Sequence, residues 1–545
     1  MKKSVVYQIY PRSFYDGNGD GIGDLQGVIQ KLDYLSELGV DYIWLTPFYI
    51  SPQNDNGYDI ADYYQVDPAF GTMADFEMLV AETQKRSINI MLDMVFNHTS
   101  TAHPWFKKAL AGDEDFKEFY IFKKGAEGLP PTNWASKFGG SAWEYVEKFD
   151  QYYLHLFDVT QGDLNWENPQ VRAEIYRVAN FWLEKGVKGF RLDVINLISK
   201  PALYEDDHQG DGRRFYSDGP KIHTYLKELN AKTFGRYDDV ITVGEMSATN
   251  LDACIKYSHP EEKELSMVFN FHHLKVDYKD GDKWSLMPFD FAQLKAIFKE
   301  WQEGLQAGGG WGAVFWCNHD QPRILSRFGD PVNYPLESAK MLATSIHLMR
   351  GTPYIYQGEE IGMTNPGYEH LHQYRDVESI NYYRILEGQG IEKKEIIKIL
   401  QAKSRDNSRT PMQWDDSPHG GFTTGTPWIE TGSGFESVNV AASLRDPASV
   451  FHHYQKLIRL RQEYDIISHG SISMILEDHP QVLAYERRLK DQKLIVLNNF
   501  YGETAHVLLA ETEAGFVLVG NYPDSPSFAK KVTLRPYESV AFLVE

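Results

Sequence analysis

Eight short apolar runs, separated by helix-like segments, constrain the fold of this 545-residue chain more than any other feature. They are residues 5–11, 41–47, 88–98, 189–196, 240–246, 265–271, 313–320 and 352–360. Continuous apolar character predicts strands that are covered on both faces, as in a parallel sheet. Amphipathic stretches such as 25–39 and 169–186, each with a glycine at its end, predict helices between the strands. This alternation predicts an α/β fold of the (β/α)8 TIM-barrel type.

The uneven spacing of the runs predicts two further domains. About ninety residues separate the third run from the fourth, far more than one helix requires. We assign residues 99–166, rich in Trp, Tyr, Phe and Gly, to a subdomain inserted after strand 3, and residues 1–98 and 167–467 to the barrel. A second excursion covers residues 364–449. From residue 468 to 545 the pattern changes to short alternating segments, which predict an antiparallel C-terminal β-sandwich. These segments are 482–489, 493–500, 505–511, 515–521 and 539–545.

Charge and cysteine content exclude several classes of partner. The formal net charge is −21, so nucleic acid or an anionic membrane would meet net repulsion, and no long basic run offsets it locally. The two cysteines, Cys254 and Cys317, lack metal-ligand spacing and cannot form a disulfide framework. The N-terminus lacks the pattern of a signal peptide, and no apolar stretch is long enough to span a membrane. We therefore expect a cytoplasmic, monomeric protein that binds a small molecule.

Polar and charged residues stand at the ends of the expected strands, on the side that forms the mouth of a (β/α)8 barrel. In chain order they are Asp93, Asn97, His98, Arg191, Asp193, Glu245, His319 and Asp320. Arg191 and Asp193 are two positions apart, so their side chains point the same way from one strand. A single acidic residue is most often a solvated loop charge, but its recurrence at neighbouring strand ends argues against that interpretation. Cleavage of a glycosidic bond requires such a group: a carboxylate nucleophile near a carboxylic acid of raised pKa.

Four motifs, DMVFNH, GFRLDVINLI, TVGEM and NHDQPR, resemble in order and spacing the four sequence regions of the α-amylase family of glycoside hydrolases. QIYPRSF, DNGYD, YQGEEIGMTN and SRDNSRTPMQW are similar to one subgroup of that family, which contains oligo-1,6-glucosidases, dextran glucosidases and trehalose-6-phosphate hydrolases. The resemblance covers essentially the whole chain, and all four regions are intact.

The resemblance implies a role for each residue at the mouth of the barrel. Asp193 would be the nucleophile, with Arg191 holding it ionised, and Glu245 would be the general acid and then the general base. Asp320 would bind hydroxyls of the distorted sugar ring. The covalent displacement that this implies requires the two carboxyl groups of Asp193 and Glu245 to be about 5–5.5 Å apart.

The resemblance also implies a pocket for a single glucose. His98 and His319 would form hydrogen bonds to it, Asp55 and Arg405 would close the pocket around its 4-hydroxyl end, and Tyr58 would stack on the ring. Phe157 would line the wall, although ordinary core packing explains this residue equally well. A pocket closed in this way implies an exo-acting enzyme that releases one glucose.

The segments 270–284 and 210–220 resemble those of trehalose-6-phosphate hydrolases, whereas the position of Lys275 is acidic in the oligo-1,6-glucosidase pattern. A phosphorylated disaccharide needs local cations to enter a protein of charge −21. Lys275 and Lys283 are the candidates, with Arg213 and Arg214 behind them. A surface lysine is ordinarily only solvated, but Lys275 lies just past the end of the sixth strand. We therefore expect hydrolysis of α,α-trehalose 6-phosphate to glucose and glucose 6-phosphate.

Two alternatives remain. Val194, next to the expected nucleophile, resembles the residue of family members that cleave α-1,6 links, so isomalto-oligosaccharides are the second candidate substrate. A non-catalytic amylase-like scaffold is the third possibility. Such scaffolds carry a membrane span and have lost catalytic carboxylates, and neither property is expected of this chain.

The segment DGNGDGIGDL places oxygen ligands at alternate positions of a glycine-rich loop, namely Asp16, Asn18, Asp20, the carbonyl of Ile22, and Asp24. This spacing is typical of calcium loops, although the Glu of an EF-hand is missing from the twelfth position. We expect Ca²⁺, with Mg²⁺ or a water-filled loop as alternatives. Because the loop follows the first strand, away from the expected catalytic carboxylates, the ion would be structural.

Overall fold

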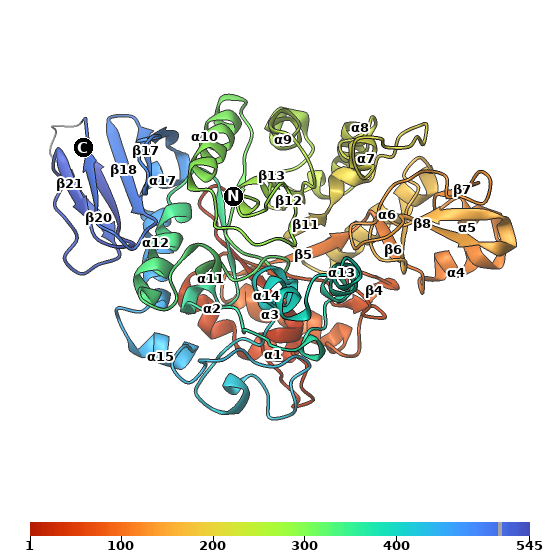
Figure 1. The fold of residues 1–545 in the computed structure, drawn as a ribbon, viewed down its shortest axis with the longest axis horizontal. Coiled ribbons are helices and arrows are strands. Elements are labelled where there is room, and N and C mark those ends of the chain that lie inside the picture. The colour runs from red at the N-terminus through yellow and green to blue at the C-terminus, as the bar shows by residue number, and fades with distance from the viewer. Residues whose placement is uncertain (511–514, 545) are drawn as a thin grey trace.

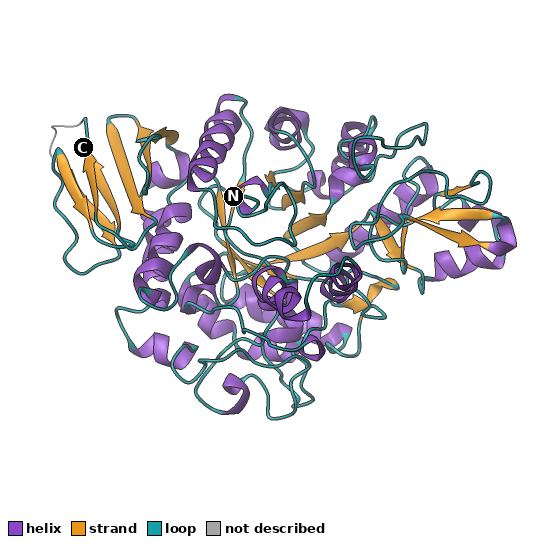
Figure 2. Ribbon diagram, viewed as in Figure 1, coloured by secondary structure: helices purple, strands orange, loops and turns teal. Residues whose placement is uncertain are grey.

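A computed structural model of the protein describes residues 1–510 and 515–544, and its largest sheet has eight parallel strands. The strands are β1 (Val6–Ile9), β2 (Tyr42–Leu45), β5 (Asn89–Val95), β11 (Gly189–Asp193), β12 (Ile241–Glu245), β13 (Met267–Phe269), β14 (Ala313–Val314) and β15 (Thr352–Tyr356). Their order is β13-β12-β11-β5-β2-β1-β15-β14, and a parallel bridge between Val268 and Gly312 joins the two ends. The sheet therefore closes into a barrel, as the sequence predicts (Figures 1 and 2).

Helices surround this barrel, and their ends follow from local sequence signals. They are α1 (Leu25–Gln30), α2 (Leu32–Leu38), α3 (Met73–Lys85), α6 (Pro169–Glu184), α8 (Ile222–Lys232), α9 (Leu251–Ser258), α10 (Phe291–Ala307), α12 (Pro335–His347) and α16 (Val450–Glu463). The side chain of Thr72 accepts a hydrogen bond from Asp75 in a capping box at α3, and Asn168 caps α6, which has proline at its first position. These caps satisfy backbone N–H groups that a helix start leaves unpaired.

The inserted segment forms its own small sheet beside the barrel mouth, at the right of Figure 1. Strands β7 (Phe122–Lys123), β9 (Gln151–Leu154) and β8 (Trp143–Val146) pair in that order and are antiparallel. Strands β6 (His98–Ser100) and β10 (Gln161–Asp163) pair where the segment leaves and rejoins the barrel. Helices α4 (Pro104–Ala111) and α5 (Glu114–Lys117) belong to the same segment. Trp134, Trp143 and Tyr216 lie in a hydrophobic cluster shared with the β11 end of the barrel.

The remaining loops carry further short elements. They are β3 (Tyr49–Ile50), β4 (Asp62–Val66), α7 (Arg213–Tyr216), α11 (Ile324–Phe328), α13 (Val377–Gly388), α14 (Lys393–Lys403) and α15 (Val440–Arg445). The pair α13 and α14 follows the last barrel strand and has its own buried cluster, which includes Tyr383, Ile396 and Leu400.

The C-terminal part of the chain forms two antiparallel sheets, at the left of Figure 1. After α17 (Asp465–His469), the strands are β16 (Ser471–Ile475), β17 (Val482–Leu489), β18 (Gln492–Asn499), β19 (Ala505–Leu508), β20 (Gly515–Gly520), β21 (Lys531–Leu534) and β22 (Ser539–Val544). One sheet has the order β16-β17-β18-β22-β20, the other pairs β19 with β21, and both contribute to one buried cluster. The expected segments 505–511 and 539–545 end at residues 511 and 545, which lie outside the described residues.

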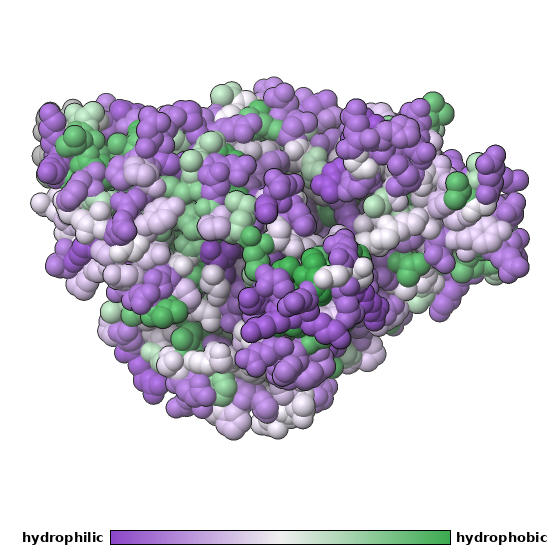
Figure 3. All heavy atoms as spheres, in the orientation of Figure 1, coloured by the Kyte–Doolittle hydropathy of each residue, from purple (hydrophilic) through white to green (hydrophobic). Residues whose placement is uncertain are grey.

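The visible surface is mostly polar (Figure 3), as expected for a chain in which 24% of the residues are charged. The face drawn in Figure 3 is mainly hydrophilic, with small scattered hydrophobic patches. Every helix in residues 1–510 and 515–544 is too short or too polar to cross a bilayer.

Candidate active site

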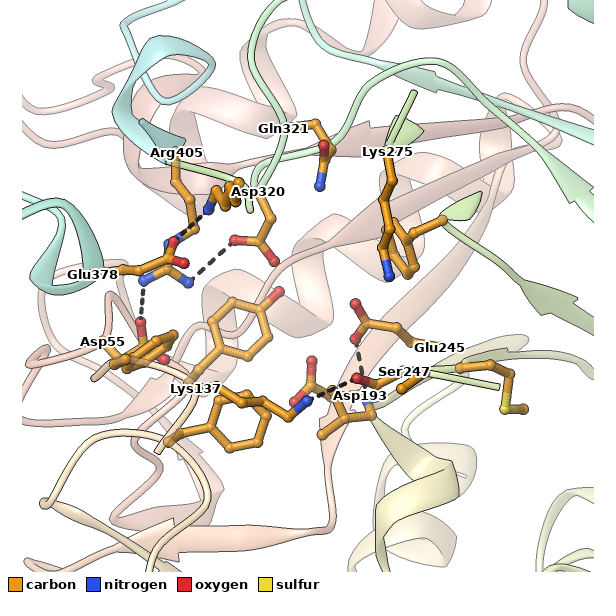
Figure 4. A pocket seen from close by; sticks show the side chains of 18 of the residues that line it. Asp55, Lys137, Asp193, Glu245, Ser247, Lys275, Asp320, Gln321, Glu378 and Arg405 are labelled. Carbon is orange, nitrogen blue, oxygen red and sulfur yellow. Dashed lines mark hydrogen bonds and ion pairs between the residues drawn. The ribbon is translucent and has the colours of Figure 1, made fainter. Parts of the chain in front are cut away.

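The barrel mouth holds a cavity of about 240 Å³ (Figure 4). Eleven of the residues that the sequence singles out line it: Asp55, Tyr58, His98, Phe157, Asp193, Val194, Glu245, Lys275, Lys283, Asp320 and Arg405. Arg191 and His319, which are 1% and 0% exposed, are buried next to these lining residues. Strand ends, the inserted segment and the excursion after β15 thus meet at one site.

Arg191 joins the two central carboxylates. In the register of β11 and β12, Leu192 lies opposite Gly244, so Asp193 and Glu245 end adjacent strands. Arg191 Nη1 lies 2.5 Å from Asp193 Oδ1, and its Nη2 contacts Glu245 Oε2. A planar guanidinium that bonds two carboxylates fixes the orientation of both.

Asp93, which is buried in the barrel, contacts Arg191 and so helps to fix its position. Its Oδ1 lies 2.8 Å from Arg191 Nη1, and its Oδ2 accepts hydrogen bonds from Trp44 Nε1 (3.1 Å) and the Tyr58 hydroxyl (2.9 Å). The side chain is fully buried, and burial raises its pKa to about 6. Asp93 therefore holds Arg191 and Tyr58 in place and does not line the cavity.

Strained backbone follows Asp193. Val194 has φ 36° and ψ 40°, a left-handed conformation that is unusual for a β-branched residue. Its N–H donates a hydrogen bond of 3.2 Å to Glu245 Oε2. The chain thus turns sharply out of β11 and supplies a second donor to Glu245.

The pair Asp193 and Glu245 shares the field of one cation. Burial raises the pKa of Asp193 well above its usual range, and the charges of Glu245 and Asp93 act in the same direction against the opposing charge of Arg191. Arg191 contacts both carboxyl groups and so offsets part of this effect. Two carboxyl groups on adjacent strand ends are the groups that glycosidic cleavage requires, one as a carboxylate and the other as an acid.

An arginine closes one end of the cavity. Arg405 Nη2 lies 2.9 Å from Asp55 and 2.5 Å from Asp376, and its Nη1 lies 3.3 Å from Asp320. Burial raises the pKa of Asp55 to about 7 despite Arg405 and Arg409 nearby. This end gathers Asp55, Glu378 and Arg405 at the left of Figure 4.

Asp320 stays ionised beside these groups. Arg409 Nη2 lies 2.7 Å from its carboxylate. Burial alone would raise the pKa of Asp320, but His319, Arg405 and Arg409 hold it below its usual range. Asp320 is thus a fixed negative charge facing the cavity, suited to a sugar ring that becomes positive in the transition state.

Aromatic rings line the floor and wall. Tyr58 stacks on His319 with ring centres 5.1 Å apart and an angle of 4°, and His98 contacts Phe157 at 5.0 Å. Burial lowers the pKa of His98 to about 4 and that of His319 to about 3, so both imidazoles are neutral near pH 7. Phe157 both lines the cavity and belongs to a hydrophobic cluster.

The basic candidates differ in their partners. Lys275 lines the cavity, its side chain is exposed, and it forms no ion pair among the described residues. Lys283 also lines the cavity, but its Nζ lies 2.6 Å from Glu378. Arg213 and Arg214 pair with Asp211 and Asp207, at 2.5 Å and 2.9 Å, and neither lines the cavity.

Comparisons with known proteins agree with this geometry. A family model described as "Alpha amylase, catalytic domain" matches residues 8–470, and one described as "Alpha-amylase SusG C-terminal domain" matches residues 482–541. The chain belongs to the α-amylase family.

Within this family, a trehalose-6-phosphate hydrolase of Bacillus subtilis is 56% identical, over 99% of this chain and 97% of its own. An oligo-1,6-glucosidase of Parageobacillus thermoglucosidasius is 49% identical, over 100% of this chain and 98% of its own. The crystal structure of trehalose-6-phosphate hydrolase from Bacillus licheniformis superposes with a TM-score of 0.96 at 56% identity, covering 100% of this chain and 99% of that one.

The family motifs do not mark every residue of the site. Lys137, Ser247 and Glu378 lie outside these motifs and also line the cavity. Glu378 follows Asp376, which caps α13, so a polar helix start was the only local signal for it. Lys137 is the single charged residue among the aromatic, small and glycine residues 134–143, and this contrast was a signal that sequence reasoning passed over.

The acidic loop after β1 consists of successive side-chain-capped turns. Asp16 Oδ1 accepts from Asn18 N, Asn18 Oδ1 from Asp20 N, and Asp20 Oδ1 from Ile22 N, at 3.1, 2.9 and 2.9 Å. Asp24 caps α1. In the described chain, no group of three or more His, Cys, Asp or Glu side chains is placed to hold a metal ion. These Asx turns pair backbone N–H groups with side-chain oxygens at the same alternate positions.

Proposed function

We propose that the protein is a retaining, exo-acting α-glucosidase that hydrolyses α,α-trehalose 6-phosphate to glucose and glucose 6-phosphate. Family membership and relatives named for this activity support the reaction class. The observation that supports this choice of substrate is the position of Lys275. This lysine lines the cavity, and no carboxylate among the described residues forms an ion pair with it. In a chain of charge −21, such a cation favours an anionic ligand.

The proposed reaction uses the two carboxyls joined by Arg191. The glucosyl unit binds at the end closed by Asp55 and Arg405. Ionised Asp193 attacks the anomeric carbon while Glu245 donates its proton to the glycosidic oxygen, which leaves with glucose 6-phosphate. Glu245, now ionised, takes a proton from water, and that water displaces Asp193 and releases glucose with its original anomeric configuration.

The surrounding groups keep the pair in this state. Arg191 stabilises the ionised carboxylate of whichever member has lost its proton, since it contacts both. The fixed charge of Asp320 stabilises the positive ring. His98 and His319 are neutral and can donate or accept hydrogen bonds to sugar hydroxyls.

The phosphate would lie on the Lys275 side of the cavity, away from the end that Arg405 closes (Figure 4). Lys283 is a weaker candidate because Glu378 already neutralises its charge. A phosphate at Lys275 would favour phosphorylated over plain trehalose, since the contact orients the leaving sugar.

Isomalto-oligosaccharides are the second candidate substrate. Relatives named oligo-1,6-glucosidase are 46–49% identical over nearly the whole chain, and they share the scaffold. The test is the ratio of kcat/KM for trehalose 6-phosphate to that for isomaltose, with glucose and glucose 6-phosphate quantified as products. We expect a ratio far above one; a preference for isomaltose would refute the phosphosugar assignment.

We also propose that the Asp16 loop binds a structural Ca²⁺ ion. Its carboxylate, amide and carbonyl oxygens are the ligands that a hard cation prefers. Burial raises the pKa of Asp24, and its backbone hydrogen bonds oppose this shift. The negative charges of Asp16 and Asp20 also raise it, so Asp24 experiences electrostatic repulsion from both carboxylates. An ion would replace some of the turn hydrogen bonds.

We also propose that the protein is a monomer and is located in the cytoplasm. A charged sugar phosphate as the substrate is compatible with a cytoplasmic location.

A further inference from the structure

Lys137 is a second cation at the cavity, placed there by the inserted segment. Its backbone N–H donates to Leu156 O at 2.9 Å, and the neighbouring Ser136 hydroxyl donates to Phe157 O at 2.7 Å. Its Nζ donates to Ser247 Oγ at 2.9 Å, across the gap between the inserted segment and the loop after β12. Both ends of this side chain are therefore held.

Most other lysines at or near the site are paired with a carboxylate. Lys200, Lys283 and Lys403 lie 2.8, 2.6 and 2.9 Å from Asp163, Glu378 and Asp277. Lys137 is half-buried, yet within residues 1–510 and 515–544 it forms no ion pair with any carboxylate. A partly desolvated ammonium with only a neutral hydroxyl partner is costly unless an anion arrives.

The charges that face Lys137 come from every element around it. Burial and then the charges of Arg213 and Lys275 lower its pKa to about 8, and the charges of Asp211 and Glu245 oppose this shift. The rings of Phe157 and Tyr216 lie 5.9 and 5.8 Å from its Nζ. Lys275 is thus close enough to repel Lys137, and an anion between the two would relieve both.

We propose that Lys137 binds the phosphate of the leaving sugar together with Lys275, and so determines specificity for the phosphorylated disaccharide. Its Nζ lies on the Glu245 side of the cavity, where the leaving group must receive its proton, and not at the end closed by Arg405 (Figure 4). This inference rests on the proposed function, because it concerns the phosphate of that substrate.

The test compares trehalose 6-phosphate with the uncharged 4-nitrophenyl α-glucoside on the same enzyme preparation. Lys137→Met should lower kcat/KM for the phosphorylated substrate by about 10- to 100-fold, the effect of losing a charge-assisted hydrogen bond, and change the uncharged substrate little. Lys137→Arg keeps the charge and should retain most of the preference. Lys124→Met, on the same segment but exposed, is the matched control.

The pH dependence gives a readout that a structural role would not move. The ratio of the two kcat/KM values cancels the titration of the general acid, since both substrates need it. In the wild type this ratio should fall as pH rises through about 8, where Lys137 loses its proton. In Lys137→Arg the fall should be smaller, because only Lys275, whose pKa burial also lowers, then loses its charge.

Three results would overturn the proposal. Equal losses on both substrates would place Lys137 at the reacting centre, and no loss on either would deny it a role. A wild type with no preference for trehalose 6-phosphate over isomaltose would instead refute the proposed function, and this inference with it. Because each ratio is measured on one preparation, partial misfolding of a variant does not affect it.

Discussion

Arg191 Nη1 lies 2.5 Å from Asp193 Oδ1, and the same guanidinium contacts Glu245 through its other nitrogen. A single buried cation thus contacts both carboxyls, which the proposed reaction requires in different protonation states. Arg191 is 1% exposed, so water screens these contacts only weakly.

Replacing Asp193 by Asn should abolish turnover while leaving the fold intact. The amide cannot attack the anomeric carbon, so kcat should fall by about 10³-fold or more. Burial raises the pKa of Asp193, which means that the folded protein holds its charge at a cost. The melting temperature of Asp193→Asn should therefore equal or exceed that of the wild type. Activity within tenfold of the wild type would remove Asp193 from the nucleophile role.

Lys275 should matter for the phosphate and not for the glucosyl unit. We expect Lys275→Met to lower kcat/KM for trehalose 6-phosphate by about 10- to 100-fold and to leave 4-nitrophenyl α-glucoside almost unchanged. Arg214→Met is the control, because Arg214 pairs with Asp207 outside the cavity. If Arg214→Met had the larger effect, the phosphate would lie elsewhere.

Glu359 should make stability fall as pH rises. It is 8% exposed, accepts a hydrogen bond from Tyr356 N at 2.7 Å, and burial raises its pKa to about 8. The folded state thus binds a proton that the unfolded state has lost above its ordinary pKa, so the cost grows between about pH 4.5 and 8. Glu359→Gln removes this cost.

Denaturant titrations of the wild type and Glu359→Gln at pH 5 and pH 8 measure this difference. The free energy of unfolding of the variant minus that of the wild type should be larger at pH 8 than at pH 5, by on the order of 2–4 kcal/mol. A constant difference would show that Glu359 has an ordinary pKa.

Calcium should act on stability and not on the chemical step. If the Asp16 loop binds the ion in the folded state, a 100-fold excess over Kd should add about 2.7 kcal/mol to the free energy of unfolding. EDTA should lower Tm and leave kcat at low temperature unchanged, and Asp20→Ala should abolish the response to Ca²⁺. If Ca²⁺, Mg²⁺ and EDTA all leave Tm unchanged, the Asp16 loop does not bind a structural ion and the proposal is wrong.

Strand ends made much of this site predictable. Asp193, Glu245 and Asp320 follow buried apolar runs, and the closure of a parallel barrel brings such ends together whatever their separation in sequence. The eight-stranded sheet was predictable for the same reason, since each run is apolar and is followed by a helix or loop.

Side chains on loops were not predictable in this way. The pairing of Lys283 with Glu378 joins residues 95 positions apart, and no local pattern links them. Lys137 reaches the cavity only because the inserted segment folds back to Ser247. In the Asp16 loop a clear local pattern has two explanations. The alternate oxygen positions resemble a metal-binding loop, and the same side chains also accept hydrogen bonds from backbone N–H groups.

The most direct test of the account is NMR of the first products formed from trehalose 6-phosphate. The bond from the glucose 6-phosphate carbon to the bridging oxygen stays intact, so that product must appear as the α anomer and serves as an internal control. Double displacement at Asp193 predicts that glucose also appears first as the α anomer, in equal amount. Initial β-glucose, or no cleavage of this substrate, would contradict the account.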